Sequence, residues 1–535
     1  MSFLSLTPEL KIAKRVIRNL EQEKVERSAR YILIESFQTP SNRLGLTFFA
    51  PVLSRFLNAK LVAFYMMPFN RKEFLKEKLR FLFSVEKAIG CKSFMYFASS
   101  DSKKYDLEAE SLIRNVRSLV EFETLQYRDI FIGDLIYDVY LRKFRKPTLD
   151  LNDECLIKVV SEFIQYFDAL YRKFSADEIA GVCVSHTVYF LGLPARMAAY
   201  FGVPAFQVTG ESIYRIDRKN THAYTAFKSY PELFSSLPEE MQIHGKKLAK
   251  ERLDLRFAGE VGIDMHYSTK SAYHHSPDQS RVLKDNSKPH VLVAIHDFYD
   301  SPHSYGLNLF PDFYQWLVAL VKISQKTDYN WYIKTHPDVR GDGISVIREF
   351  VNQNPDFTII PSSTSHHQLI KEGISLALTI FGSIAMEYPY LGIPVMNASL
   401  NNPHVRYSFS MSPSNVAEYE SLLQNINEMR VPKDKDPILE YYFVNNVYML
   451  KSWTIKNYDA YFKAIDSRKL AHSWQIFSYF KEGRNVYEAR VLQDVISNFL
   501  SSDDSFLSRK HYPHEIDFGE VMSDTKLAIF DKWDI

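Results

Sequence analysis

Residues 376–399 read LALTIFGSIAMEYPYLGIPVMNAS. The apolar run from Leu376 to Ile380 predicts the end of a buried strand, Phe381-Gly382 predicts a turn, and Ser383 is well placed as the N-cap of a short helix. Pro389 disfavours continuation of that helix, and Gly392-Ile393-Pro394 closes it and starts the next strand. A strand, a turn, a helix and a second strand form the repeating unit of a parallel, doubly wound sheet.

The turn in this unit has the features of an anion site. Backbone N–H groups at a helix start attract negative charge, and Gly382 has no Cβ, so a phosphate could approach the backbone closely while Ser383 donates a hydrogen bond. Glu387 lies one helical turn after Ser383 and could accept hydrogen bonds from the vicinal hydroxyls of a ribose. The alternatives are that the serine only caps the helix and that Glu387 anchors it to a neighbouring cation.

The same alternation extends through the second half of the chain. Strands are expected in VLVAIH, NWYIKTH and FTII, and helices in FPDFYQWLVALVKIS, GISVIREFVNQ and SHHQLIKEG. These segments predict a second doubly wound domain over residues 286–430. The remainder, residues 431–535, is expected to be a helical extension rich in aromatic residues.

The first half repeats the pattern. YILIESF is expected to be a strand, QTPSNRLG a turn, LTFFAPVLSRFLNA a helix and KLVAFYM a strand, and IAGVCVSHT, VYFLGLPARMAAYFG and VPAFQVTG form a later strand, helix and strand. Residues 31–285 are therefore expected to form a first doubly wound domain, preceded by an amphipathic helix within residues 1–30. The polar run 274–290 is expected to be a linker.

Polar side chains cluster where the strands of the second half end. The stretch NWYIKTHPD places Lys334 and His336 at a strand's carboxyl edge, where both could contact a phosphate. His296 and His303 lie with two aspartates in the loop HDFYDSPHSYG. A leaving-group-stabilising loop is favoured over a metal site there, because no two of these residues have a fixed helical spacing. No metal and no cofactor are expected.

The first half offers several candidates for a general base. His186 follows a strand in VSHTVY and is the first candidate, with a buried structural histidine as the alternative. Glu211 in QVTGES and Asp134 in IGDLIYDVYLR are the others, and the sequence does not choose among them.

Composition excludes several classes of protein. Lys plus Arg total 65 against 64 Asp plus Glu, so no overall field favours nucleic acid as a partner. The three cysteines are widely spaced, which argues against a disulfide framework and fits a cytoplasmic protein. The N-terminus lacks the apolar core of a signal peptide, and no apolar run approaches the ~20 residues that span a bilayer. Any contact with the inner face of a membrane is expected to be peripheral.

KTHPD followed by GSIAMEYPYLGIPV resembles the nucleotide-binding half of GT-B glycosyltransferases of the capsule and surface-polysaccharide type. These families include bacterial sialyltransferases and Kdo transferases with a His-Pro motif, and CDP-glycerol glycerophosphotransferases. The resemblance covers Val291 to about Tyr407 and implies a GT-B fold, in which two Rossmann-like domains face each other across a cleft. It also implies donor contacts by His336, Ser383 and Glu387.

The function expected from the residues and the resemblance is transfer of a sugar from a nucleotide-activated donor to a growing cell-surface glycan or lipid-linked glycan. A sialic acid donor is disfavoured, because the first half carries no Asp/Glu-Asp-Gly motif of the sialyltransferases. The alternatives are a non-hydrolysing nucleotide-sugar 2-epimerase, a glycerophosphotransferase, and a non-catalytic assembly protein on the same fold.

Overall fold

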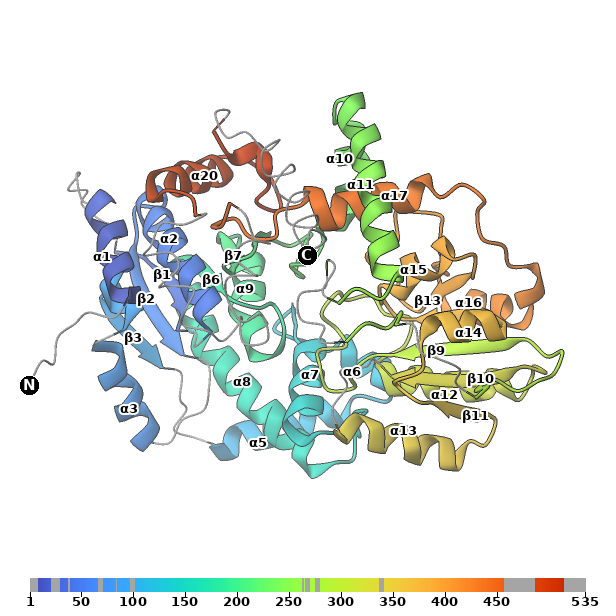
Figure 1. Ribbon diagram of the computed structural model, residues 1–535. Coiled ribbons are helices and arrows are strands. Elements are labelled where there is room, and N and C mark those ends of the chain that lie inside the picture. The colour runs from blue at the N-terminus through green and yellow to red at the C-terminus, as the bar shows by residue number, and fades with distance from the viewer. Residues whose placement is uncertain are drawn as a thin grey trace, which may run out of the picture.

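The computed structural model describes residues 8–20, 29–36, 39–65, 71–82, 84–96, 102–261, 264, 270–274, 280–335, 341–456 and 486–513. These residues contain two separate sheets of mainly parallel strands, each covered by helices on both faces (Figure 1). The expected α/β fold class is therefore confirmed: the chain has two Rossmann-like doubly wound domains, with additional helices before and after them.

The first sheet has the strand order β3-β2-β1-β6-β7-β8, and its pairs are parallel except for β7 with β8. Its strands are β1 (Tyr31–Glu35), β2 (Lys60–Tyr65), β3 (Ser93–Tyr96), β6 (Ile179–Val184), β7 (Ala205–Val208) and β8 (Ile213–Ile216). A separate antiparallel pair joins β4 (Gln126–Tyr127) and β5 (Ile130–Phe131).

The second sheet is parallel throughout, with the order β11-β10-β9-β12-β13. Its strands are β9 (His290–Ile295), β10 (Asn330–Thr335), β11 (Phe357–Ile360), β12 (Ile374–Thr379) and β13 (Val395–Asn397). Side chains alternate across this sheet, so that Val291 and Val293 enter one core cluster and Leu292 enters the other.

Helices fill the connections between the strands. Those up to β6 are α1 (Pro8–Leu20), α2 (Pro40–Phe56), α3 (Arg71–Leu82), α4 (Val85–Ala88), α5 (Ser102–Arg114), α6 (Leu119–Glu123), α7 (Gly133–Phe144) and α8 (Glu154–Ser175). Those between β6 and β9 are α9 (Tyr189–Phe201), α10 (Tyr230–Ser235) and α11 (Glu239–Phe257). Those after β9 are α12 (Phe313–Ser324), α13 (Gly341–Gln353), α14 (His366–Glu372), α15 (Ile384–Tyr390), α16 (Val416–Gln424), α17 (Asp436–Phe443) and α20 (Ala489–Ser501).

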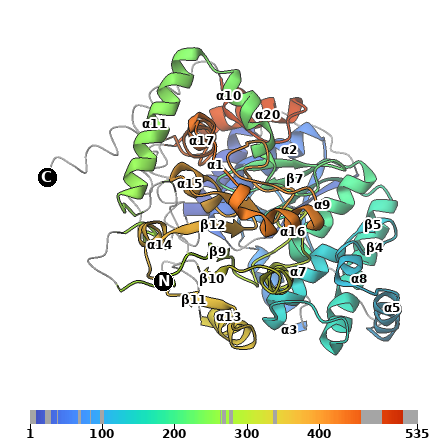
Figure 2. The same cartoon turned by 90° about the vertical axis from the view of Figure 1, so that its right-hand side faces the viewer.

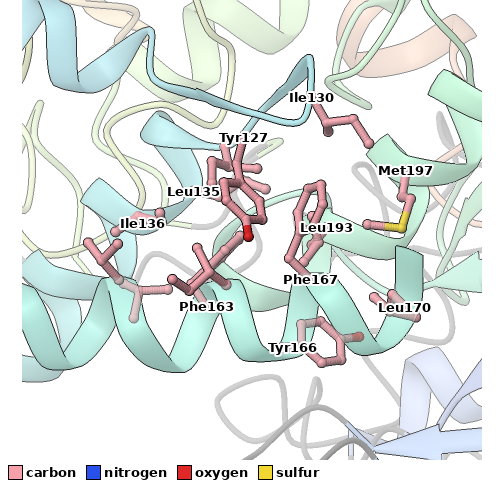
Figure 3. Packing of buried hydrophobic residues seen from close by; sticks show 14 of the residues in the cluster. Tyr127, Ile130, Leu135, Ile136, Phe163, Tyr166, Phe167, Leu170, Leu193 and Met197 are labelled. Carbon is pink, nitrogen blue, oxygen red and sulfur yellow. The ribbon is translucent and has the colours of Figure 1, made fainter. Parts of the chain in front are cut away.

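Each face of the first sheet has its own apolar core. The cluster that contains Ile32 and Ile34 packs under α1, α2, α4 and α20, whereas the cluster that contains Leu33 packs under α5, α7, α8 and α9. Figure 3 shows the second of these clusters, where aromatic side chains of α8 meet apolar side chains of α7 and α9. The residues of α8 labelled there are Phe163, Tyr166, Phe167 and Leu170.

Both sheets have a topological switch point, where consecutive connections leave in opposite directions. In the first sheet it lies between β1 and β6, and in the second between β9 and β12. Ligands of open α/β sheets bind beyond the carboxyl ends of the strands at such points. The switch points therefore define where functional side chains should be sought.

One predicted turn is part of a helix. Residues 40–45 were expected to lie in the turn QTPSNRLG, but α2 already begins at Pro40, with Thr39 as its N-cap. Proline fits the first turn of a helix, because the N–H group that it lacks has no partner inside the helix. Residue 37 of the predicted strand YILIESF, residue 38 of the predicted turn and residue 66 of the strand expected next lie outside the described residues.

Some segments that were expected in different domains pack together in one hydrophobic core. Helix α11 packs against α17 and α15 in one aromatic-rich cluster, and Figure 2 shows α11 beside these helices. Of the expected linker, residues 275–279 lie outside the described residues, but the backbone N–H groups of Val282 and Leu283 donate to Glu372 of the second domain at 3.0 and 2.8 Å. The linker's second half is thus bound to that domain.

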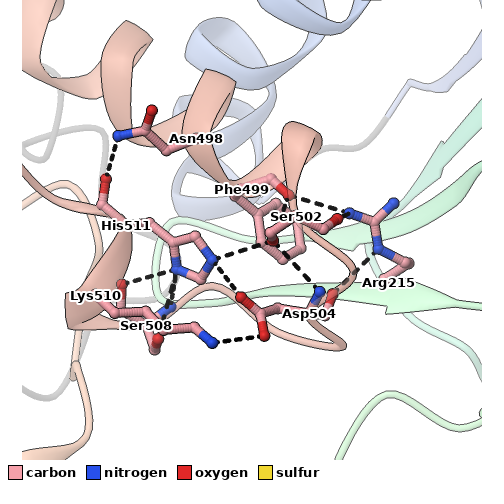
Figure 4. A network of polar contacts seen from close by, with 8 residues as sticks. All are labelled: Arg215, Asn498, Phe499, Ser502, Asp504, Ser508, Lys510 and His511. Carbon is pink, nitrogen blue, oxygen red and sulfur yellow. Dashed lines mark hydrogen bonds and ion pairs between the residues drawn. The ribbon is translucent and has the colours of Figure 1, made fainter.

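The segment around α20 returns to the first domain. Arg215 N–H donates to the carbonyl of Ser505 at 2.8 Å, and Leu507 N–H donates to that of Ile213 at 2.9 Å, so the segment extends the antiparallel edge at β8. Figure 4 shows the polar network that holds it there, in which His511 contacts Asp504 at 2.9 Å. No described helix is both long and apolar enough to cross a bilayer.

Candidate functional site

The switch point of the first sheet carries a buried carboxylate. Glu35 ends β1 and Ser185 follows β6, and both are buried. The Ser185 N–H donates to Glu35 Oε2 at 2.7 Å, and the Ser185 hydroxyl lies 3.0 and 3.2 Å from the two carboxylate oxygens. Burial raises the pKa of Glu35 to about 7, although the hydrogen bonds from Ser185 oppose that rise.

His186 continues this arrangement toward the second domain. Its Nδ1 lies 2.9 Å from the Ser185 hydroxyl, which makes a continuous chain from Glu35 to the imidazole. Burial lowers the pKa of His186, and the nearby Arg142 guanidinium lowers it further, while Asp300 opposes them. The imidazole is therefore neutral near pH 7 and can act as a proton acceptor.

The groups around His186 come from both domains. Arg142 of α7 lies 3.8 Å from Asp300, which belongs to the loop after β9. The Tyr189 hydroxyl, from α9, lies 3.5 Å from the same carboxylate, and the Arg142 guanidinium lies over the Tyr189 ring at 4.8 Å. His186 is thus within electrostatic reach of the first loop of the second domain.

The switch point of the second sheet brings His296 and Gly382 together. Thr379, the last residue of β12, has its hydroxyl 3.3 Å from His296 Nε2 and accepts a hydrogen bond from the Gly382 N–H at 3.1 Å. A Cβ on Gly382 would lie 2.7 Å from the Thr379 hydroxyl and 3.5 Å from the His296 ring. Gly382 is therefore needed for close packing against Thr379.

Ser383 occupies the N-cap position that the sequence predicted, but it makes no capping hydrogen bond with its side chain. Its backbone is already helical, at φ −59° and ψ −20°, which does not aim the hydroxyl at the N–H groups of the first turn. Instead, the hydroxyl is hydrogen-bonded to Glu387.

Glu387 is buried and bound by the protein itself. Arg256 of α11 forms an ion pair and a hydrogen bond with Oε1, and the Tyr273 hydroxyl donates to Oε2 at 2.7 Å. Although burial alone would raise the pKa of Glu387, Arg256 and Tyr273 lower it. This arrangement corresponds to the alternative in which Glu387 anchors its helix to a neighbouring cation. The contribution of Arg256 was not recognised in the sequence.

Lys334 lies at the carboxyl end of β10 and is only 3% exposed. Its ammonium group donates to the Ser362 carbonyl at 2.9 Å, and burial lowers its pKa to about 8. His336 lies two residues further along the chain and outside the described residues, so its contacts are not part of the structure.

His303 joins the two domains through a buried acidic cluster. Its Nδ1 lies 2.6 Å from Asp138 of α7, and its Nε2 lies 3.8 Å from Glu123 of α6. Burial alone would lower the pKa of His303, but the two carboxylates raise it to about 10. His303 is therefore a buried cation at the domain junction.

Asp312 completes the contact between the domains. It is the N-cap of α12 and accepts hydrogen bonds from Tyr137 at 2.5 Å and from Thr148 at 2.6 Å, both in the first domain. Burial raises the pKa of Asp312. Together with the His303 cluster, it fixes the loop after β9 against α7.

Asp134 and Glu211 have different surroundings from His186. Arg196 binds both oxygens of Asp134, at 2.5 and 2.9 Å, and His222 lies 3.6 Å away. Burial alone would raise the pKa of Asp134, but Arg196 and His222 hold it well below its usual range, which disfavours proton acceptance. Glu211 is exposed in the turn between β7 and β8, where its N–H donates to Thr209 at 3.1 Å.

Glu35 is the residue of this site that the sequence interpretation missed. The available signal was its position, because it ends the apolar strand YILIE as His186 follows the strand IAGVCV. The described residues contain no group of three or more His, Cys, Asp or Glu placed to bind a metal ion.

No protein family model and no curated protein matches the chain. Similar solved structures include UDP-GlcNAc 2-epimerase from Neisseria meningitidis bound to UDP-GlcNAc, with 11% identity, coverage of 78% of this chain and 98% of that chain, and a TM-score of 0.24. A glycosyltransferase from Rickettsia africae ESF-5 has 9% identity, coverage of 85% and 99%, and a TM-score of 0.24. The wall teichoic acid polymerase TagF has 11% identity, coverage of 92% and 95%, and a TM-score of 0.19. Similarity at this level supports no conclusion about activity, so the fold assignment rests on the two sheets themselves.

Proposed function

We propose that the protein is a glycosyltransferase that moves a sugar from a nucleotide-activated donor to a hydroxyl of a growing cell-surface glycan. The observation that carries the proposal is the position of His186. A neutral, oriented imidazole lies at the switch point of the first sheet, beside the loop that follows the first strand of the second sheet. A base between two such domains suits a reaction that joins two substrates.

The first domain supplies the acceptor side in this proposal. His186 takes the proton from an acceptor hydroxyl, whose oxygen attacks the anomeric carbon of the donor sugar. The bond between that carbon and the phosphate oxygen breaks, and the nucleotide leaves with the electron pair. The pKa of His186, lowered by burial and by Arg142, keeps the imidazole unprotonated before the attack.

The second domain supplies the donor side. His296, Gly382 and Ser383 lie at its switch point, and Lys334 lies at the end of the adjacent strand β10. A positive charge on Lys334 would stabilise a diphosphate, and bound phosphate would favour that charge by offsetting the cost of burial. His336 is proposed to add a further donor, on the strength of its position after β10 and of the motif KTHPD.

The proposal is tested by incubating the full chain with UDP-, CMP- and CDP-activated donors and following nucleotide release with and without glycan acceptors. Release that requires an acceptor, with the sugar recovered on that acceptor, supports it. Conversion of a donor to its 2-epimer without an acceptor would indicate an epimerase instead. Transfer of glycerol phosphate would indicate a glycerophosphotransferase. No reaction with any donor would favour an assembly protein.

The proposed chemistry uses protein groups for both proton acceptance and leaving-group stabilisation, so it requires no metal. Excess EDTA should leave acceptor-dependent nucleotide release unchanged. Loss of release with EDTA, followed by rescue with one divalent cation, would assign a metal to the reaction.

A further inference from the structure

The chain of contacts from Glu35 through Ser185 to His186 can transmit a proton. We propose that Glu35 and Ser185 form a relay that selects which nitrogen of His186 carries the proton, and that both are positioning residues for the base. This inference rests on the proposed function only in identifying His186 as that base. The relay itself is a property of three neighbouring side chains.

The geometry restricts the relay to two hydrogen-bonding states. The Ser185 hydroxyl has one proton and contacts both the carboxylate, at 3.0 Å, and His186 Nδ1, at 2.9 Å. When Glu35 is ionised, the hydroxyl donates to the carboxylate and accepts from Nδ1–H, so Nε2 is the unprotonated nitrogen of the neutral imidazole. When Glu35 is protonated, it donates to the hydroxyl, which donates to Nδ1, and the proton of the neutral imidazole lies on Nε2.

The two states are linked by the transfer of one proton from His186 through Ser185 to Glu35. In the ionised state, Nε2 accepts the proton of an acceptor hydroxyl and the imidazole becomes a cation. Nδ1–H then passes to the Ser185 oxygen while the hydroxyl proton passes to Glu35. The result is a neutral imidazole with Nε2–H and a neutral Glu35, and loss of one proton to solvent restores the starting state.

The surroundings of Glu35 suit a group that changes its charge. Among the described residues, only Ser185 donates hydrogen bonds to this carboxylate, and no cation pairs with it. A buried carboxylate that stays ionised normally has a cationic partner. Burial raises the pKa of Glu35 to about 7, which allows it to take up and release a proton near neutrality.

Several other titratable groups among the described residues act on the relay. Tyr166 of α8 lies near Glu35. Burial raises the pKa of the Tyr166 phenol, and the charge of the Glu35 carboxylate raises it further. Arg142 of α7 and Asp300 of the loop after β9 act on His186 with opposite signs. Tyr189 of α9 contacts Asp300. The Arg142 cation disfavours the imidazolium, which favours onward transfer of its proton to Glu35.

The chain offers a matched control. Glu86 is also buried, and it accepts a hydrogen bond from the Ser36 hydroxyl at 3.2 Å, one residue after Glu35. This second serine and carboxylate pair has no described contact with His186. Unlike Glu35, Glu86 also lies 3.8 Å from the Arg43 guanidinium, so Glu86→Gln removes a buried, ion-paired carboxylate near the same end of the first sheet and leaves the described contacts of the relay in place.

The experiment is NMR of the full chain with labelled histidines, where the His186 signal is assigned by its loss in His186→Gln. Wild type should change from the Nε2–H to the Nδ1–H form as pH rises through about 7. Glu35→Gln should hold the neutral imidazole of His186 in the Nε2–H form both below and above pH 7, because the amide donates to Ser185 and cannot titrate. Glu86→Gln should behave as wild type. A folded Glu35→Gln protein in which His186 changes to the Nδ1–H form above pH 7, as wild type does, would overturn the relay.

Turnover provides a second measurement. If the proposed function is correct, Glu35→Gln should lower kcat about 100-fold and leave KM for the donor unchanged, because the base is present in the wrong form. Ser185→Ala should have a similar effect. A tautomer change in Glu35→Gln, in a protein whose wild type processes no donor, would support the relay and overturn the proposed function.

Discussion

Glu387 is held on both oxygens, by Arg256 and by Tyr273, so its removal should act on stability. Glu387→Gln would leave the Arg256 guanidinium buried beside a neutral amide, and loss of one partner from a buried ion pair typically costs ~3–5 kcal/mol. Denaturant unfolding of wild type and variant measures this cost. Glu232→Gln is the control, since its ion pair with Arg406 is exposed and the variant should unfold almost as wild type does.

The same variant decides whether Glu387 also contacts the donor. Nucleotide affinity is measured by calorimetry on folded protein. Equal dissociation constants for wild type and Glu387→Gln would assign the carboxylate to anchoring alone, whereas a loss in the variant would add a ribose contact. A variant as stable as wild type would contradict the structural role assigned to the ion pair with Arg256.

Because of His303, the stability of the folded protein should decrease as the pH becomes alkaline. Its pKa in the folded protein is about 10, above the ordinary value of 6.5, so its charge stabilises the fold fully below pH 6.5 and this contribution is lost as pH rises toward 10. The expected loss is on the order of a few kcal/mol. Unfolding free energies of wild type between pH 7 and pH 10 measure it.

The control for that measurement is the double variant His303→Gln with Asp138→Asn, which keeps a hydrogen-bonding pair and removes both charges. Its stability should fall less than that of wild type over the same pH interval. Parallel pH profiles would show that His303 is not the buried cation described above.

The sequence predicts which candidate site residues follow the ends of strands. It does not predict which residues form ion pairs or hydrogen bonds with them. His186 and His296 follow buried strands, which is visible as a polar residue after an apolar run. The pairing of Glu387 with Arg256 joins residues 131 positions apart, and that of His303 with Asp138 joins residues 165 apart. Such contacts depend on how two domains and their added helices pack, which local patterns do not determine.

At the scale of elements, helix α2 depends on a close approach to the turn after β7. A Cβ on Gly45 would lie 2.3 Å from the Thr209 carbonyl oxygen, and that oxygen also accepts a hydrogen bond from the Trp453 indole at 2.8 Å. Gly45→Ala should therefore force α2 away from this turn and destabilise the protein by ~1–3 kcal/mol or more. Chemical denaturation measures the effect.

Gly181→Ala is the matched comparison for that variant. Its added methyl group would come within 2.9 Å of only the Leu57 side-chain end, which can move, so the loss of stability should be smaller. A Gly45→Ala protein as stable as Gly181→Ala would contradict the close packing of α2 on the turn.

Elements with strong periodicity were predicted well, and their ends less so. The strands β9, β10 and β12 are apolar runs bounded by polar turns, and α12 has a clear amphipathic pattern. The start of α2 was missed, because Thr39-Pro40-Ser41 suits a turn and a helix start equally well. The choice is made by burial, since Ser41 and Asn42 are covered by the first domain.

At the scale of the whole molecule, the domains meet through the loop after β9. Asp300, His303 and Asp312 each contact the first domain, and the segment around α20 returns to its edge strand. Two switch points, each with a histidine, are thus held in one molecule. In the proposed reaction, the histidine of the first domain acts on the acceptor while the second domain holds the nucleotide.

The most direct test compares His186→Gln with wild type in two assays on the same preparations. Acceptor-dependent nucleotide release should fall ~10²- to 10⁴-fold, because the base is lost. The dissociation constant of the nucleotide should stay within about twofold of wild type, because the donor contacts are on the other domain. His244→Gln, an exposed histidine of α11, should change neither. Wild-type release by folded His186→Gln would contradict the account.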